Sequence, residues 1–398
     1  MTTPDPFDPR APLPGPPDPW ASTDQPSRRS GPPYHMTDMI AAEPAVAERL
    51  LERLLPGGSS AAELAGAVAE TMRHGLPVVV TGCGTSEHAS LGVADILREA
   101  GGAAGLPGPG PVSAQAFELS LDPPTGGLVI GVSHEGGTAA TNAALRASRE
   151  AGSRTALITV TRRSPGAALA DLVVETEELD QGWCHTVGYL SPLVAATAVG
   201  SHLSGRPIGP SAMARLIADG AGRGPVAAGI GATLAGAAHL IVIASGADRT
   251  AGRELVLKIE EGSWIPSAYR DLETFLHGHL PATGEDTGLV LILADRSARD
   301  ARLARALGAL RAARALGIRT AAILASGISD AVDPTLTPAG RLVVPEAPDL
   351  PAPVAALLGT ATPLQVLTEW IARARGTDPD PIRRDDPRYA AAADAAEG

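Results

Sequence analysis

Short apolar runs alternate with amphipathic stretches along most of the chain, and several of the runs are followed by a glycine-containing turn. The runs have the length of buried strands, and the amphipathic stretches repeat their apolar positions every three or four residues, as helices do. Strands are expected at 78–81, 128–132, 155–160, 240–244 and 289–294, and helices at about 87–100, 138–151, 249–261 and up to about 316. Such alternation predicts an α/β fold in which helices cover both faces of a parallel sheet.

The second half of the pattern repeats the first. GLVIGVS at 127–133 matches GLVLILA at 288–294, and AGSRTALI at 151–158 matches LGIRTAAI at 316–323. A repeat of roughly 160 residues is too long for a solenoid and indicates two copies of one domain. The copies are expected at 36–205 and 225–376, joined by a linker rich in Gly, Pro and Ser at 206–224.

The two ends of the chain differ from the repeated part. Residues 1–35 are rich in Pro, Asp and Ser and have too little apolar surface to order themselves, which predicts a disordered tail. A helix is expected next, capped by Thr37 or Asp38 and ending near residue 55, before Pro-Gly-Gly. Residues 377–398 are expected to form a C-terminal tail.

Composition restricts the partners. The 398 residues carry a net charge of -12 with no basic stretch, which argues against nucleic acid or an anionic membrane surface. Cys83 and Cys184 are the two cysteines, too few for a disulfide framework. The N-terminus lacks the features of a signal peptide, and no apolar run has the length of a membrane span. We therefore expect a cytoplasmic protein.

Two loops of the first copy are candidates for a ligand site. They are GCGTS at 82–86 and SHEGGT at 133–138, and each directly follows an expected strand. Ligands of open parallel sheets bind beyond the carboxyl ends of the strands, where helix N-termini present free N–H groups. The matching loops of the second copy, at 245–249 and 295–297, carry fewer hydroxyls and more charges. This contrast predicts one ligand pocket per chain, built on the first copy.

These loops, together with MTDMIAAEPAVAERLLERL and ELVLKIEEGSWIPSAY, resemble the sugar isomerase (SIS) family, most closely the isomerase half of glucosamine-6-phosphate synthase. The resemblance covers about residues 36–385. It implies two tandem SIS domains, each a Rossmann-like three-layer α/β/α unit with a parallel sheet. It also implies a sugar or sugar phosphate as substrate, and a homodimer with a shared active site.

The resemblance assigns candidate roles residue by residue. Thr85 and Ser86 of the unchanged GCGTS loop would contact the sugar and its phosphate. Ser133 and Thr138 match the family's second loop, SQSGET. Within LKIEE, Lys258 matches the family's active-site lysine and Glu261 its proton-transferring glutamate. The resemblance therefore implies that the substrate is bound by Thr85, Ser86, Ser133, His134, Glu135 and Thr138, and that Lys258 and Glu261 are catalytic.

His277 matches the histidine that opens the sugar ring, which in the family reaches into a neighbouring subunit's site. Thr186, in the segment that closes the family's sugar pocket, is expected to contact the substrate, and Cys184 is expected to pack. His279 would then be a bystander. The alternative for His277 is a structural role in the Leu-His-Gly turn.

The residues themselves suit this chemistry. Proton transfer between C1 and C2 of an open-chain sugar needs a carboxylate over the carbon and an acid–base group for ring opening. Glu261 suits the first task and His277 the second. Lys258 is the only lysine in the chain, so an otherwise arginine-based composition retains one compact, tunable cation at this point. The alternative for Glu261 is a solvated helix face.

Three departures from the family pattern limit the assignment. The sequence before residue 36 is too short for a glutaminase domain, so glutamine is not expected as the nitrogen source. In the second loop His134 replaces Gln, and Glu135 replaces a phosphate-binding Ser, which would repel a phosphate. The tail lacks the family's catalytic lysine and carries Arg383 and Arg384, which are possible substrate contacts.

The sequence thus predicts an aldose–ketose isomerase, or an enzyme that aminates or deaminates a keto or amino sugar, without glutaminase activity. One alternative is a ketosamine (fructosamine-type) deglycase, and another is a non-catalytic sugar-phosphate sensor. No metal or organic cofactor is expected, because the His and Cys residues lack ligand spacing.

Overall fold

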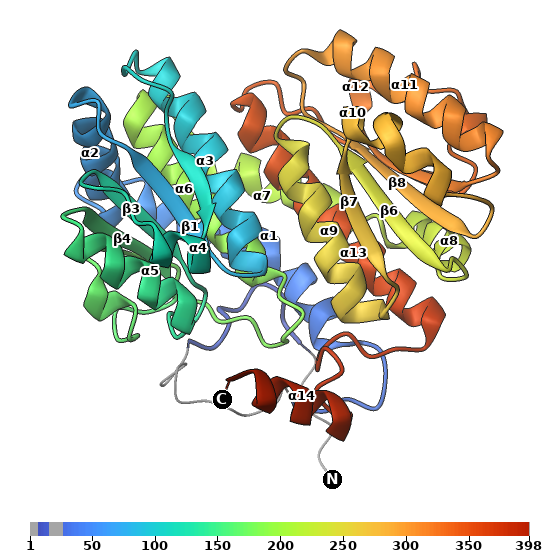
Figure 1. The fold of residues 1–398 in the computed structure, drawn as a ribbon, viewed down its shortest axis with the longest axis horizontal. Helices are drawn as coiled ribbons and strands as arrows, with labels where there is room; N and C mark the ends of the chain where they lie inside the picture. The colour runs from blue at the N-terminus through green and yellow to red at the C-terminus, as the bar shows by residue number, and fades with distance from the viewer. Residues whose placement is uncertain (1–6, 16–26, 398) are drawn as a thin grey trace.

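The computed structural model describes residues 7–15 and 27–397, and it contains two parallel five-stranded sheets (Figure 1). The first has the order β2 (Val112–Gln115), β1 (Val78–Gly82), β3 (Leu128–Val132), β4 (Arg154–Thr159), β5 (Leu172–Glu175). The second has the order β7 (Ser267–Asp271), β6 (His239–Ala244), β8 (Thr287–Leu293), β9 (Arg319–Ala325), β10 (Gly340–Val344). Strand by strand the two orders are the same, which confirms the prediction of two tandem α/β/α domains.

Alternation along the strands assigns side chains to the two faces of each sheet. Val78 and Val80 of β1 join the large central core, whereas Val79 between them joins a smaller cluster on the opposite face. In the second sheet Val290 of β8 faces the central core and Leu289 faces away. Both faces are apolar because helices cover both of them, as expected for a parallel sheet.

In the first half, three helices cover the inner face of the sheet and share its core: α2 (Ser60–Arg73), α3 (Thr85–Ala103) and α6 (Val187–Ser204). Two helices cover the outer face: α4 (Ala116–Leu121) and α5 (Ala139–Glu150). A short helical turn, η1 (Ala167–Leu169), precedes β5.

In the second half the inner face is covered by α8 (Gly224–Leu234), α9 (Asp248–Ser263) and α13 (Ala352–Arg375). The remaining elements of this half are α10 (Leu272–Thr274), η2 (Phe275–His279), η3 (Leu280–Ala282), α11 (Arg299–Ala315), α12 (Ser326–Ser329) and η4 (Pro334–Leu336). Among these, α11 packs on the outer face of the sheet.

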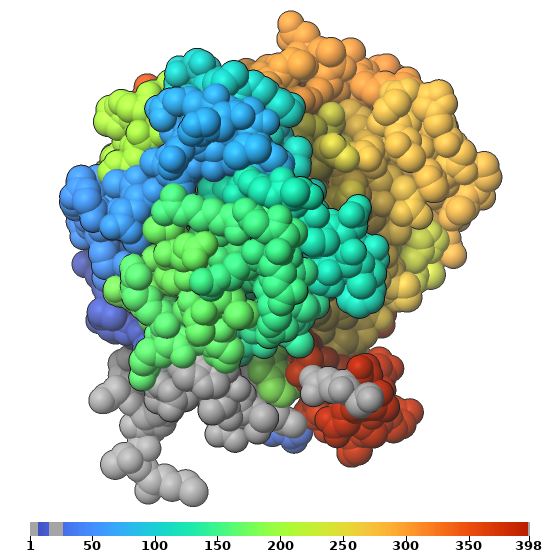
Figure 2. Space-filling model, turned by 60° about the vertical axis from the view of Figure 1, so that its left-hand side comes forward, coloured from blue at the N-terminus to red at the C-terminus, as the bar shows by residue number. Residues whose placement is uncertain are grey.

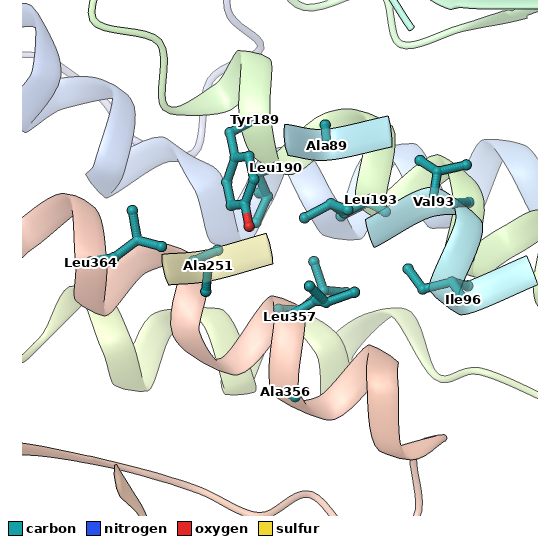
Figure 3. Packing of buried hydrophobic residues seen from close by; sticks show 14 of the residues in the cluster. Ala89, Val93, Ile96, Tyr189, Leu190, Leu193, Ala251, Ala356, Leu357 and Leu364 are labelled. Carbon is teal, nitrogen blue, oxygen red and sulfur yellow. The ribbon is translucent and has the colours of Figure 1, made fainter. Parts of the chain in front are cut away.

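The inner faces of both sheets belong to one continuous hydrophobic core. Figure 3 shows its centre, where α3, α6, α9 and α13 meet, with Leu193 of α6 beside Val93 of α3 and Leu357 of α13. These three side chains are fully buried. The two halves therefore form a single packed body, and α3 and α9 pack against each other at the boundary between them (Figure 1).

Helix α1 (His35–Leu54) begins earlier than predicted. Its capping residue is Tyr34, whose backbone N–H donates to Thr37 Oγ1 at 3.0 Å. The carboxylate of Asp380 accepts from the backbone N–H groups of His35 and Met36 at 2.7 and 2.9 Å. The expected cap at Thr37 or Asp38 was therefore wrong, because a residue from the far end of the chain satisfies the helix N-terminus.

The structure differs from two further expectations, which concern the N-terminal tail and the linker. Residues 7–15, assigned to a disordered tail, lie against the first half: the backbone N–H of Leu13 donates to Glu178 Oε2 at 2.8 Å, and Leu13 is buried. Residues 27–34 also have described positions, whereas 1–6 and 16–26 lie outside the described residues. The segment expected as a linker contains helix α7 (Pro210–Ala221), which packs on α1 and α13.

The C-terminal segment ends in helix α14 (Pro387–Glu397). Figure 2 shows the first half, blue to green, in contact with the second half, yellow to orange, and the red C-terminal segment at the lower end of the molecule. None of the helices in the described ranges is long and apolar enough to cross a membrane.

Candidate functional site

A cleft of about 290 Å³ lies at the carboxyl end of the first sheet. Its walls come from the loops after β1 and β3, the segment before α6, the last turns of α9 and the C-terminal tail. Because α9 belongs to the second half, the cleft is formed by both halves. We call it the first cleft.

The loop after β1 is shaped by its glycines. A Cβ on Gly82 would lie 2.5 Å from the carbonyl oxygen of Ser86, and Gly84 has a φ of 57°. The chain can therefore turn tightly enough for α3 to begin at Thr85. Thr85 and Ser86 both line the first cleft, as predicted from the motif, and Thr85 Oγ1 donates to Glu254 Oε1 at 3.3 Å.

The loop after β3 contributes three of its four predicted contacts to the cleft. His134, Glu135 and Thr138 line the first cleft. Ser133 does not: it is buried, and its Oγ accepts from the Gly136 N–H at 3.1 Å and lies 3.3 Å from Thr138 Oγ1. Ser133 thus holds the loop in shape, and Thr138 presents the hydroxyl.

Behind this loop lies a cluster of Asp180, His134 and His185. The backbone N–H of Asp180 donates to His134 Nε2 at 3.0 Å, and burial together with the neighbouring His185 lowers the pKa of His134 to about 3. His134 is therefore neutral, with its proton on Nδ1. The Asp180 carboxylate accepts from three backbone N–H groups at 2.6 to 3.2 Å: those of Gly182 and Thr186 before α6, and that of Gly188 in its first turn.

His185 differs from His134 in charge. Burial alone would lower the pKa of His185, but Asp180, 3.8 Å from its Nδ1, outweighs this and raises it. The same two histidines and the backbone donors hold the pKa of Asp180 at about 2 despite its burial. The first cleft therefore contains an imidazole that readily becomes cationic, next to Glu135, whose pKa is raised by burial.

The last turns of α9 bring Lys258 and Glu261 to the cleft. Lys258 is fully buried, and its Nζ lies 2.6 Å from Glu261 Oε2 and 3.5 Å from Glu254 Oε1. Burial disfavours the ammonium, but the two carboxylates outweigh it and raise the pKa of Lys258. Lys258 therefore stays protonated and cannot act as an amine nucleophile. Glu261 is partly exposed and lines the cleft.

Glu254 and His88, which the sequence analysis did not single out, extend the row of charges formed by Lys258 and Glu261. Glu254 is fully buried and lies 2.8 Å from His88 Nδ1, while Lys258 and His88 keep its pKa low against the effect of burial. The spacing of Glu254 four residues before Lys258 on one helix face is a sequence signal that could have identified it. Asp180 and His185 carry no such signal, because their contacts depend on how the loops fold.

The C-terminal tail reaches the first cleft. Arg384 lines it and stacks on the Trp183 ring, 4.8 Å from the ring centroid. Arg383 points to a neighbouring surface, where its guanidinium lies 4.5 Å from the Trp264 ring centroid and 4.0 Å from that of Tyr389. Of the two possible tail contacts, only Arg384 therefore lines the first cleft.

Three predicted positions lie away from the first cleft. Thr186 is fully buried, and its backbone N–H donates to Asp180, so it supports the segment rather than lining the cleft. Cys184 is buried in the core beside Lys258, as expected of a packing residue, and burial raises its pKa. His277 is 68% exposed on η2, with Nε2 2.6 Å from Glu273 Oε1.

A second and larger cleft, of about 770 Å³, lies at the carboxyl end of the second sheet. The expectation of one pocket on the first copy was therefore wrong. The second cleft is lined by the loop after β6, by α9 and by α3 of the first half. The charges of its loops pair with side chains of neighbouring elements: Arg249 pairs with Asp271 of β7, and Asp295 pairs with Arg302 of α11.

The chemistry available in the two clefts differs. The first combines a partly exposed carboxylate fixed by a buried ammonium, hydroxyl-bearing loops, a guanidinium, and an imidazole whose pKa Asp180 raises. Such a set can abstract and return a proton beside a polar, anionic ligand. The second cleft presents hydroxyls, arginines and four carboxylates, each of which is paired with an arginine.

Comparisons with known proteins agree with this architecture. No protein-family model matches the sequence, and no curated protein matches it either. Among solved structures, the C-terminal domain of glucosamine-fructose-6-phosphate aminotransferase from Francisella tularensis is similar, with a TM-score of 0.75 and 19% identity, over 89% of this chain and 99% of that one.

Two further solved structures are similar over nearly their whole length. Tagatose-6-phosphate ketose/aldose isomerase from Escherichia coli has a TM-score of 0.67 and 16% identity, over 87% of this chain and 95% of that one. Glucosamine-6-phosphate deaminase from Thermotoga maritima has a TM-score of 0.63 and 15% identity, over 87% and 96%. The chain therefore has the fold of the tandem sugar isomerase (SIS) domain proteins.

Proposed function

We propose that the first cleft catalyses proton transfer between C1 and C2 of an open-chain sugar that carries an anionic group. The proposal rests on the ion pair between Lys258 and Glu261, because Glu261 lines the same cleft as the hydroxyl-bearing loops. Lys258 engages Oε2 of Glu261 and so leaves Oε1 to act on the substrate. The solved structures with this fold include an aldose/ketose isomerase and an amino-sugar phosphate deaminase, which favours the same class of reaction here.

In the proposed reaction Glu261 removes the proton at C2 of an aldose, and the electron pair forms an enediol. Glu261 then returns the proton to C1, while a proton moves from O2 to O1, so that a ketose results. Lys258 remains an ammonium throughout and fixes the carboxylate without exchanging a proton. Thr85, Ser86 and Thr138 hold the polar end of the sugar.

The anionic end of the substrate would meet His185 and Arg384. Both line the first cleft, Asp180 raises the pKa of His185, and Arg384 is fixed by stacking on Trp183. These cations offset the charge of Glu135, which occupies the loop position expected to contact a phosphate. An unopposed carboxylate a few Å from a phosphate would cost on the order of 1–4 kcal/mol.

Ring opening is assigned to His277 in a homodimer, where the exposed His277 of each chain would reach into the first cleft of the other. This part of the proposal is supported by the 68% exposure of His277 and its position on η2, outside the first cleft of its own chain. Mixing Glu261→Gln chains with His277→Ala chains tests it. Activity that returns on mixing supports a shared site, whereas two inactive variants that stay inactive as mixed dimers contradict it.

The overall test is NMR of the purified protein in deuterated buffer with glucose 6-phosphate, fructose 6-phosphate and glucosamine 6-phosphate, each with and without ammonium. Deuterium that enters at C1 or C2 in the wild type, and is retained in Glu260→Gln but lost in Glu261→Gln, is the expected result. Glu260 is the matched control because it is exposed on the same helix and does not line the first cleft. Dependence on ammonium would separate amination from isomerisation.

A ketosamine deglycase is the second candidate, and the coexistence of Glu135 with Arg384 favours it. A conjugate of a sugar and an amino acid carries both an ammonium and a carboxylate, which these two side chains could receive. Release of the free amino acid from fructosyl-lysine, without exchange in any phosphorylated sugar, would support this candidate over the isomerase. Saturable binding without turnover of any substrate would leave the non-catalytic sensor.

A further inference from the structure

The second cleft is built on the same plan as the first. Helices α3 and α9 both begin directly after the loop that follows the equivalent strand of their sheet. Each helix starts at its own cleft and ends by lining the cleft of the other half, so that α9 contributes Glu261 to the first and α3 contributes Arg98 to the second. The two clefts are therefore related by the internal repeat.

The crossing helices carry opposite charges at matching positions. Lys258 and Glu261 lie 10 and 13 residues after α9 begins at Asp248, and Asp95 and Arg98 lie 10 and 13 residues after α3 begins at Thr85. Both are ion pairs with i,i+3 spacing. The group next to the second cleft is thus a guanidinium where the first cleft has a carboxylate, so the second cleft lacks the base at this position.

Pairing within the second cleft leaves one arginine available. Each of the four carboxylates that line it is in an ion pair with an arginine: Asp95, Glu99, Asp271 and Asp295. Arg253 also lines the cleft, and in the described ranges it is in no ion pair; its guanidinium lies 4.9 Å from the Tyr269 ring centroid. The cleft therefore has one positive charge left for a ligand.

A buried hydroxyl next to Arg253 also lacks a partner. Thr250, in the first turn of α9, is 1% exposed and lines the second cleft, and within the described part of the chain its Oγ1 finds no hydrogen-bond partner. Buried hydroxyls are normally hydrogen-bonded, so an unpaired one at the wall of a cleft indicates a site for a polar ligand. Ser245, in the loop before α9, adds a second hydroxyl to the wall of the second cleft.

We infer that the second cleft is a non-catalytic binding site for a carbohydrate that carries one phosphate or carboxylate group. Arg253 receives the anionic group, with Ser245 and Thr250 donating to it. The paired carboxylates of Asp95 and Asp295 accept hydrogen bonds from the sugar hydroxyls, and the guanidinium groups of Arg98 and Arg302 donate to them. This inference is independent of the reaction proposed for the first cleft, because it uses none of the same side chains.

Isothermal titration calorimetry of the full-length chain tests the inference with glucose 6-phosphate, glucuronate, glucose and inorganic phosphate. We expect binding of glucose 6-phosphate or glucuronate to weaken about tenfold or more at one site in Arg253→Gln, because a charge-assisted hydrogen bond is lost. Thr250→Val, which keeps the side-chain shape, should weaken the same site, and Arg311→Gln on the exposed face of α11 should not. Whichever of the two anions binds more tightly identifies the anionic group.

The variants also separate this inference from the function proposed above. If the first cleft binds no sugar, the wild type should bind one ligand per chain, and Arg253→Gln should weaken that binding about tenfold or more. If both clefts bind a sugar, the wild type should bind two ligands per chain with its full affinity, and Arg253→Gln should bind only one so tightly. The inference is overturned if no probe binds, if Arg253→Gln and Thr250→Val both bind as the wild type does, or if inorganic phosphate binds as tightly as glucose 6-phosphate.

Discussion

The two clefts of this protein have the same architecture and opposite chemistry. In the first, the crossing helix α9 brings a carboxylate, Glu261, fixed by a buried ammonium. In the second, the crossing helix α3 brings a guanidinium, Arg98, paired with Asp95. The sheet order, the strand-to-helix loops and the helix positions are shared. A duplicated fold can therefore keep one architecture in both copies while the charge at a matching helix position is reversed.

The loops that begin the two helices show the same divergence. Gly82 and Gly84 shape the first loop, and a side chain on Gly82 would meet the Ser86 carbonyl. The second loop carries Ser245 and Ala247 at the corresponding positions, and Ala247 has an ordinary helical φ of -63°. The two loops therefore place their positive-φ glycine one position apart, at Gly84 in the first and at Gly246 in the second.

The largest expected effect concerns the buried charges behind the first cleft. Lys258→Met should lower the free energy of unfolding by about 3–5 kcal/mol, because Glu254 would be left buried without its cation. Adding Glu254→Gln should recover most of the loss in urea unfolding. The corresponding change in the second cleft, Asp95→Ala, breaks a partly exposed pair and should cost less than about 1 kcal/mol. Equal losses from the two single variants would contradict the contrast.

Buried groups near the two clefts should give opposite dependences of stability on pH. The folded pKa of His134 is about 3, below its usual 6.5, so its contribution is present above pH 6.5 and is lost as the pH falls towards 3. Burial raises the pKa of Asp248, at the start of α9, to about 7 from 3.8. Its contribution is present below pH 3.8 and is lost as the pH rises towards 7.

Between about pH 4 and 6.5 these two effects oppose each other in the wild type. His134→Asn should therefore make the free energy of unfolding fall as the pH rises, and Asp248→Asn should make it fall as the pH drops. Each slope should differ from that of the wild type by at most about 1.4 kcal/mol per pH unit in urea unfolding series. The exposed His74→Asn serves as the control. Unchanged slopes in both variants would show that neither group titrates as described.

The glycine loop gives a smaller effect. Gly82→Ala should destabilise the protein by about 1–3 kcal/mol, because the new Cβ meets a backbone carbonyl that cannot move aside without shifting the start of α3. Ser245→Ala at the equivalent position should change stability by less than about 0.5 kcal/mol. Thermal unfolding measures both. A Gly82→Ala protein as stable as Ser245→Ala would mean that the first loop needs no glycine there.

The smallest effect concerns Glu135. Glu135→Ser should increase the affinity of the first cleft for glucose 6-phosphate about tenfold by removing a carboxylate from its wall, and should leave the affinity for glucose unchanged. Calorimetry in the Arg253→Gln background isolates the first cleft. A gain for both ligands would instead point to a change in loop shape.

Local sequence patterns predicted the parts of this molecule that local forces determine. Strand β3 (Leu128–Val132) has the expected bounds, and the other expected strands lie within two residues of theirs, because burial on both faces requires continuous apolar runs. The motif also identified Thr85, Ser86 and Glu261 as cleft residues. Both predictions rest on residues close together in the chain.

The remainder depends on contacts between distant segments. Asp380 caps α1, and Asp180 organises the segment before α6 through loop contacts, and neither is visible in a local pattern. Ser133 matched the motif but turns to its own loop, and the second cleft arises only when α3 meets α9. Such features can be identified only in the folded structure, because they join segments that are far apart in the sequence.

The most direct test of the contrast compares Glu261→Gln with Arg98→Leu, the matching positions of the two crossing helices. Solvent deuterium incorporation at C1 or C2 is measured by NMR for both variants, with the best substrate of the wild type. We predict a loss of at least about 100-fold in Glu261→Gln and a rate close to that of the wild type in Arg98→Leu. Incorporation that persists in Glu261→Gln, or that disappears in a folded Arg98→Leu protein, would contradict the account.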